Sequence, residues 1–235
     1  MTHLAQWKSA HLGGPRSSQG ADLRCFSAFS LIELLTVMAL IAVLSVPIAH
    51  LVREGSDARA MKSAQNLLAA QLTSARTHAI VSRAACRLLV YSDRESNPEL
   101  GDRLRRLQIA IAQGDGTWRA VGAASSLPGN IRLVPKAAPP TLRPGGWGDA
   151  PTSSLLADAA LDVWWGDRVQ RAHYYFVEFS PLGNTTGATL VLSPAVIHPV
   201  GEALAVCFTQ PTEVSGVRLS QYGALTLIPH TLAFQ

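Results

Sequence analysis

The sequence predicts an α+β fold, in which one long N-terminal helix packs on a head of antiparallel β-strands. Three observations predict it: an apolar run at residues 29–49, a helical spacing of apolar residues after that run, and a regular series of short strand-like segments beyond residue 85. Of the 235 residues, 48% are hydrophobic and 15% are charged, which excludes a mainly disordered chain. The formal charge of +4 is too small to indicate a nucleic-acid-binding protein.

The apolar run is long enough to cross a membrane as a helix. At about 1.5 Å per residue, residues 29–49 match a hydrocarbon core of about 30 Å, and Glu33 is the one charge among them. The flank before the run carries three cations and one acid: Lys8, Arg16, Arg24 and Asp22. This positive flank predicts a cytoplasmic N-terminus and a translocated head.

Two simpler interpretations of the run stay open, a cleaved secretory signal peptide and a plain uncleaved anchor. A signal peptide has a shorter apolar core of about 7–15 residues and needs small residues before its cleavage point. Here Pro47 lies two residues before Ala49, where a small residue is required. A plain anchor does not need an acidic residue within its apolar run, so this interpretation does not explain the presence of Glu33.

Glu33 is the decisive residue of the run. A carboxylate inside a membrane helix costs about 2.5–3.5 kcal/mol, whereas the helix dipole returns about 0.3–1 kcal/mol. Such an acid needs a positive partner at the same depth. If the chain were cut between Ala28 and Phe29, the new α-amine of another subunit could pair with Glu33 in trans.

Residues 28–35 (AFSLIELL) and the apolar residues 36–44 resemble the class III signal of type IV pilins and pseudopilins. The resemblance implies that a prepilin peptidase cuts between Ala28 and Phe29 and that the amine of Phe29 becomes methylated. It also implies that Glu33 neutralises the N-terminus of a neighbouring subunit during filament assembly. Ala28 stands where the family usually has Gly.

The resemblance divides the chain into a pilin-like arrangement. Residues 1–28 form a cytoplasmic leader that is removed, and residues 29–50 form the transmembrane and filament-core half of the helix. Residues 51–84 form its amphipathic half, and residues 85–235 form a periplasmic head with a Pro- and Gly-rich insertion at 136–154. The face of the amphipathic half consists of Met61, Ala64, Leu68, Leu72, Ala75 and Ala79.

Three further segments resemble the H-type minor pseudopilins: the helix end at 74–80, the F-x-P-x-G hairpin at 179–183 and the closing strand and turn at 217–223. This resemblance implies a structural subunit of the pseudopilus that drives type II protein secretion from the inner membrane. Its partners would be the prepilin peptidase, other pseudopilins, the inner-membrane secretion platform and the lipid bilayer. The alternative is a minor pilin of a type IV pilus, with a role in adhesion, motility or DNA uptake.

The head reads as a series of short strands, rich in β-branched and aromatic residues and separated by turns. We expect strands at residues 85–91, 107–112, 118–121, 131–134, 172–180, 189–192, 204–209, 217–220 and 225–228. Residues 155–165 read as a short helix that ends in Trp164 and Trp165. These two rings are expected to be one core and one rim residue, or else a contact for a partner.

No motif for catalysis, a cofactor or a metal stands out, and we expect a structural protein rather than an enzyme. Cys25 leaves with the leader. Cys86 and Cys207 remain, either as a disulfide or as buried free thiols, because geometry decides and sequence does not. The basic run at 103–106, with Arg87 and Arg94, keeps a DNA-binding role open, although Arg218 is the one cation after Gly201.

Overall fold

The computed structural model describes residues 30–92, 100–136, 147–154, 157–200, 203–230 and 234, without the side chains of residues 44–56, 200 and 203. The chain divides into two units, Met1–Ile48 and Ala49–Gln235. The helix α1, Leu31–Ser82, has residues in both units. All of the described strands belong to the second unit.

The second unit alternates strands with short turns. In chain order its elements are β1 (Cys86–Tyr91), the 3-10 helix η1 (Leu100–Asp102), β2 (Arg106–Ala112), β3 (Trp118–Ser126), β4 (Ile131–Val134), β5 (Ala157–Trp165), β6 (Arg168–Phe179), β7 (Ala188–Val200), β8 (Ala203–Phe208), β9 (Ser215–Leu219) and β10 (Leu225–Ile228).

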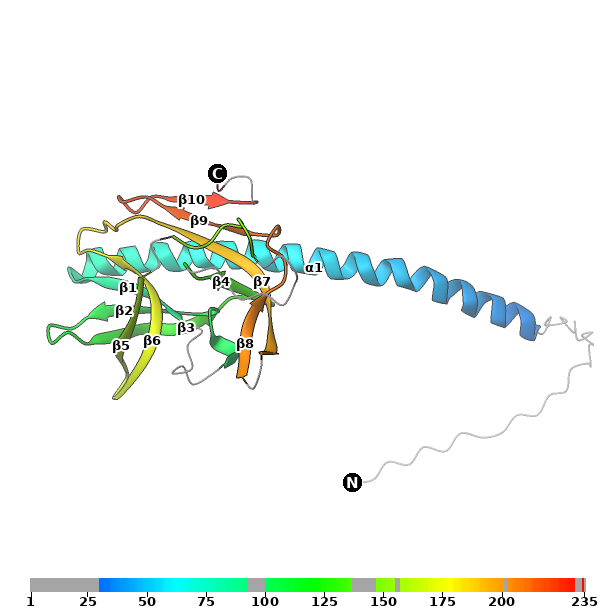
Figure 1. The fold of residues 1–235 in the computed structure, drawn as a ribbon, viewed down its shortest axis with the longest axis horizontal. Helices are drawn as coiled ribbons and strands as arrows, with labels where there is room; N and C mark the ends of the chain where they lie inside the picture. The colour runs from blue at the N-terminus through cyan, green and yellow to red at the C-terminus, as the bar shows by residue number, and fades with distance from the viewer. Residues whose placement is uncertain are drawn as a thin grey trace, which may run out of the picture. The chain divides into compact units, whose positions relative to one another are not determined.

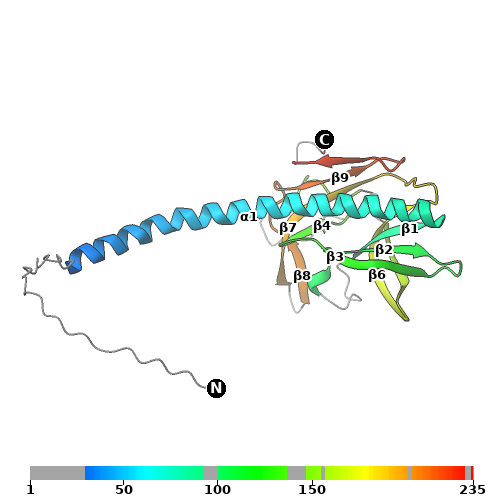
Figure 2. The same ribbon diagram turned by 180° about the vertical axis from the view of Figure 1, so that it is seen from behind.

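The strands form two sheets, which lie beside α1 in both ribbon views (Figures 1 and 2). One is a small closed barrel in the order β1, β2, β3, β5, β6, and the other is a sheet in the order β10, β9, β7, β4, with β8 paired to β7. The predicted antiparallel pairing is confirmed for every pair except β3 and β5, which are parallel and share two residue pairs. This short parallel contact closes the barrel.

Within the second unit, α1 packs on the sheets through its predicted apolar face. Five of the six predicted positions are buried and Met61 is half-buried. Leu68 and Leu72 lie in one core cluster with Leu88 of β1, Leu190 of β7 and other strand residues. A buried Leu contributes about 1.5–3 kcal/mol, so these contacts hold the helix to the head.

One buried polar side chain on the same helix face ties α1 to the second sheet. The amide of Gln65 donates hydrogen bonds to the carbonyls of Gly216 in β9, at 2.7 Å, and Ile228 in β10, at 2.9 Å. Both bonds are buried, so the amide is satisfied where burial would otherwise penalise it.

Strand β1 contributes side chains to two core clusters, because successive side chains point to opposite faces of the strand. Cys86, Leu88 and Val90 point into the cluster shared with α1, whereas Leu89 and Tyr91 belong to the cluster inside the barrel. Both faces are therefore buried, which explains the nearly continuous apolar sequence of this strand.

The helix expected at residues 155–165 is wrong, because Ala157–Trp165 is strand β5. Its Ala and Leu residues favour a helix, but pairing with β6 along the whole strand overrides that preference. Leu161, Val163 and Trp165 alternate into the barrel cluster, as a strand requires.

The described end of the 136–154 insertion packs on the second sheet, although a Pro- and Gly-rich composition is typical of an exposed loop. Trp147 is buried, packs edge-to-face on Phe208 at 5.5 Å, and donates hydrogen bonds from Nε1 to the carbonyls of Ala150 and Pro151. The hydroxyl of Ser153 accepts a hydrogen bond from the backbone N–H of Val191 in β7. The end of the insertion is thus fastened to the second sheet.

The β6–β7 and β9–β10 turns are built alike. In each, the serine that follows the strand accepts a hydrogen bond on its hydroxyl from the residue four positions on, with Ser180 and Ser220 in these roles. In each, a glycine three positions after the serine takes a positive φ, +77° at Gly183 and +76° at Gly223. The repeated Ser-x-x-Gly pattern reflects this shared geometry.

Arg76 of α1 lies against both turns. Its Nε donates a hydrogen bond to the carbonyl of Gly183 at 3.2 Å. A Cβ added to Gly223 would come within 2.8 Å of both the Arg76 side chain and the Gly183 carbonyl oxygen. We call this arrangement of Arg76, Gly183 and Gly223 the Arg76 junction. Glycine is required at Gly223 because the space, as well as φ, excludes a side chain.

Replacing Gly223 with Ala should therefore destabilise the second unit by about 2 kcal/mol or more, through crowding added to a strained φ. Gly116 is a matched control, because its φ is +83° and nothing lies within 4 Å of its added Cβ. Thermal unfolding of the purified variants measures the difference. Equal losses for G223A and G116A would mean that the Arg76 junction is not tightly packed.

Candidate functional site

The described part of the chain begins with a capped helix. The backbone N–H of Glu33 donates hydrogen bonds to the carbonyl of Ser30 at 3.0 Å and to its hydroxyl at 3.2 Å. The backbone N–H of Leu34 also donates to the Ser30 carbonyl. Ser30 is therefore the N-cap of α1, and Glu33 occupies the third helical position, where a carboxylate favours the positive end of the helix dipole.

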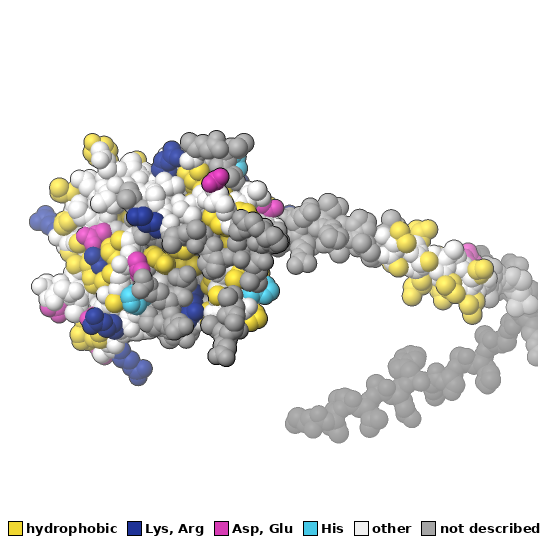
Figure 3. All heavy atoms as spheres, viewed as in Figure 1, with side chains coloured by type: hydrophobic (Ala, Val, Ile, Leu, Met, Phe, Trp, Pro, Cys, Tyr) yellow, Lys and Arg dark blue, Asp and Glu magenta, His cyan; other side chains and the backbone are white. Residues whose placement is uncertain are grey.

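Glu33 stands among exposed apolar side chains. Leu31 and Ile32 are 79% and 75% exposed, and most large apolar side chains up to Val43 are also exposed. Figure 3 shows apolar atoms gathered along this part of the helix. An apolar surface of this kind is stable only when lipid or other apolar helices cover it, and either cover would remove water from the carboxylate.

The other two predicted site residues of this region, Ala28 and Phe29, lie outside the described residues. Within the part of the chain that the structure describes, no helix is both long and apolar enough to cross a membrane.

Cys86 and Cys207 are free, buried thiols in the structure. They lie on β1 and β8, which do not pair, since β1 pairs with β2 and β6 whereas β8 pairs with β7. Burial raises the pKa of Cys86 to about 12 and also raises that of Cys207. Burial therefore disfavours the thiolate form of both cysteines, which is the form that acts as a nucleophile.

Two arginines of the basic run, Arg105 and Arg106, and Arg87 of β1 make contacts inside the fold. Arg106 forms an ion pair with Asp102 at 2.8 Å, and Arg105 donates to the carbonyl of Leu127. Arg87 pairs with Glu178 at 2.7 Å and lies over the rings of Trp118 and Phe176 at about 4 Å. These contacts stabilise the barrel, so these three charges do not form a free basic surface of the kind that binds phosphates.

The two adjacent tryptophans are both half-buried parts of the barrel. Trp164 donates a hydrogen bond from Nε1 to the hydroxyl of Thr117 at 3.2 Å, and Trp165 belongs to the barrel cluster. Among the described residues, no three His, Cys, Asp or Glu side chains are grouped so that they could hold a metal ion.

Two features of the described sites were not predicted from the sequence. The Ser-x-x-Glu spacing at Ser30 is a capping-box signature, which could have identified the N-cap. The role of Arg76 has no comparable signal, because its partners are more than a hundred positions away along the chain.

Residues 23–49 match the family model of the prokaryotic N-terminal methylation motif. The chain is similar to the type IV minor pilin FimU of Pseudomonas aeruginosa PAO1, with 15% identity and a TM-score of 0.41 over 74% of this chain and 90% of that one. It is also similar to the minor pseudopilin EpsH from the type 2 secretion system of Vibrio cholerae, with 16% identity and a TM-score of 0.40 over 72% and 95%. No curated protein matches it in sequence.

The matched motif spans Ala28, Phe29 and Glu33, the residues that the sequence pattern selects. The match shows that the chain carries a prokaryotic N-terminal methylation motif at residues 23–49.

Proposed function

We propose that this protein is a pseudopilin, which assembles through its N-terminal helix into a periplasmic filament that drives type II protein secretion. The observation that carries the proposal is Glu33, a carboxylate on a helix surface that is otherwise apolar. A filament subunit has a use for both features, since the apolar surface packs against other helices and the acid selects a charged partner.

The partner that we propose for Glu33 is the N-terminal amine of Phe29 on an adjoining subunit. Burying an unpaired carboxylate in an apolar environment costs several kcal/mol, and an amine at the same depth offsets most of that cost. The cap at Ser30 does not need the charge of Glu33, because its hydrogen bonds come from the Glu33 backbone N–H. The charge therefore calls for a function beyond starting the helix.

The topology follows from the same segment. Residues 1–28 are a cytoplasmic leader that the prepilin peptidase removes, after which Phe29 is methylated. Residues 29–50 then cross the inner membrane and later form the filament core, with the head in the periplasm. The apolar run and its positive flank support this arrangement.

Secretion is preferred over a pilus because of three segments that resemble the H-type pseudopilins. The helix end at 74–80, the hairpin at 179–183 and the turn at 217–223 meet at the Arg76 junction, so they form one structural unit in this chain. A minor pilin for DNA uptake would need a free basic surface, whereas Arg87, Arg105 and Arg106 are engaged in the fold.

A substitution at Glu33 can remove the negative charge and keep the backbone hydrogen bonds at the start of the helix. Replacing Glu33 with Gln keeps the backbone hydrogen bonds to Ser30 and a similar shape, but removes the charge. We expect E33Q to be processed and inserted normally, with incorporation into filaments and secretion reduced by tenfold or more. Filament yield and secreted protein in a strain that lacks the native copy measure the effect.

The matched control is S30A, which removes the capping hydroxyl and keeps the acid. It should assemble nearly normally. If E33Q assembles normally and S30A does not, Glu33 serves the helix start, and the pairing in trans is wrong. Loss of pilus-dependent motility or DNA uptake without loss of secretion would favour the minor pilin.

Processing is tested at Ala28, where the peptidase needs a small residue. Replacing Ala28 with Trp should leave the leader attached, whereas A28G should be cut at least as well as the natural chain. Mass spectrometry of the membrane-bound protein distinguishes the two N-termini. Natural chains that still begin with Met1 in functional cells would contradict the proposed processing.

A further inference from the structure

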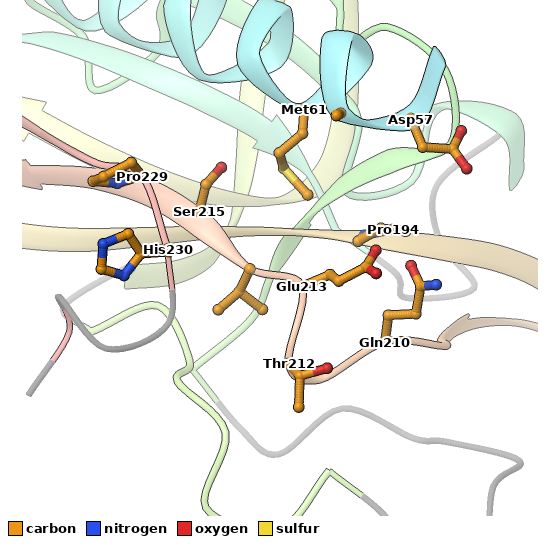
Figure 4. Close-up of a pocket in the computed structure, with 11 residues that line it drawn as sticks. Asp57, Met61, Pro194, Gln210, Thr212, Glu213, Ser215, Pro229 and His230 are labelled. Carbon is orange, nitrogen blue, oxygen red and sulfur yellow. The ribbon is translucent and has the colours of Figure 1, made fainter. Parts of the chain in front are cut away.

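A cleft of 530 Å³ in the second unit has no role in the proposed assembly mechanism. It opens between the start of the packed part of α1, which supplies Asp57 and Met61, and the segment from β8 into β9, which supplies Gln210, Glu213 and Ser215 (Figure 4). Residues that are more than 150 positions apart in the sequence thus line one space.

Two carboxylates line this cleft from different elements. Asp57 comes from α1 and Glu213 from the loop before β9, and neither forms an ion pair with any residue that the structure describes. The nearby helix cations Arg59 and Lys62 are not among the described lining residues. The titratable side chains of the described lining are these two acids and His230, so the two carboxylates favour a cation there.

Ser215 adds an independent observation. The residue is only 3% exposed, and its hydroxyl oxygen is buried without a hydrogen-bond partner in the protein. Figure 4 shows this hydroxyl directed toward α1, to one side of Met61. A buried polar group without a partner costs about 1–3 kcal/mol, so a donor that reaches Ser215 from the cleft would recover that energy.

We propose that this cleft receives an arginine side chain from a neighbouring protein subunit. A guanidinium has five N–H donors in a planar fork, which suits acceptors that come from several directions, here Asp57, Glu213, Gln210 and Ser215. The methylene stem of the arginine would lie along the apolar part of the lining, to which Met61 contributes. That the subunit is a neighbour in the filament rests on the proposed function.

Arginine is preferred to lysine because of the number and spread of the acceptors. A lysine ammonium is a compact charge with three donors, and one carboxylate satisfies it well in water. A lysine ammonium therefore gains little from acceptors on opposite walls of the cleft. The site thus predicts a selectivity that a purely electrostatic attraction would not give.

The test uses the full-length chain in detergent micelles, labelled with ¹³C at the methionine methyl groups. The chain has three methionines, and Met61 lines the cleft whereas Met38 lies in the N-terminal helix segment. N-acetyl-arginine methylamide should shift the Met61 signal saturably and leave Met38 unchanged. The uncharged isostere N-acetyl-citrulline methylamide should bind at least tenfold more weakly, and the lysine amide should also bind more weakly. No shift of Met61, or equal shifts with citrulline or lysine, would overturn the assignment.

Substitutions of lining residues test whether the arginine amide binds in this cleft. E213Q, D57N and S215A should each weaken arginine binding by about tenfold, while D167N, at an exposed acid in the β5–β6 turn, should not change it. Unchanged thermal unfolding would show that each variant is folded. Normal binding by all three cleft variants would overturn the site.

The source of the arginine is tested separately. Because the titration uses single subunits, its result does not depend on whether Glu33 drives assembly. If the isolated subunit binds arginine but E213Q enters filaments normally, the arginine does not come from a filament neighbour, and that part of the proposal fails.

Discussion

One physical constraint underlies the rest of the structure. The negative charge of the Glu33 carboxylate must be neutralised once its surroundings become apolar. Glu33 lies in the first turn of α1, capped by Ser30 and surrounded by exposed Leu and Ile side chains. In water the Glu33 carboxylate itself costs little, because it stays hydrated, whereas the apolar side chains around it remain unfavourably exposed. The carboxylate becomes costly once lipid or other helices cover the apolar surface, and in the proposed assembly a positively charged partner would offset that cost. In the proposed assembly, Glu33 therefore favours the subunit that is paired with a neighbour.

In the second unit, apolar and polar contacts hold one continuous helix against two sheets. Small and large apolar residues at helical spacing place Leu68 and Leu72 in the core, and Gln65 joins the helix to β9 and β10. At the other end, the Arg76 junction brings the β6–β7 and β9–β10 turns to the helix. The polar contacts at both ends define where along the helix the sheets sit, which apolar contacts alone would define less sharply.

The sequence predicted those parts of the fold that depend on local pattern. The helix face was correct because burial on one side imposes a 3.6-residue period, and most strands were correct because their β-branched and aromatic residues favour extended backbone. Residues 157–165 were misassigned because Ala and Leu favour a helix locally, while pairing with β6 decides the outcome. The closed barrel could not be predicted, since the two residue pairs between β3 and β5 leave no local signal.

The candidate sites also differ in whether a local sequence pattern could reveal them. Glu33 could be singled out from the sequence because a charge in an apolar run is conspicuous in one dimension, whereas cleavage between Ala28 and Phe29 stays a prediction that rests on the resemblance. The cleft lined by Asp57, Glu213 and Ser215 was not, since it exists only when distant segments come together.

The most direct test of the central claim is a cryo-EM structure of the assembled filament that resolves the N-terminal segment. The account predicts mature subunits that begin at Phe29, with each amine within about 4 Å of the Glu33 carboxylate of an adjoining subunit. Filaments in which Glu33 faces water or an uncharged group, with the amine elsewhere, would contradict it.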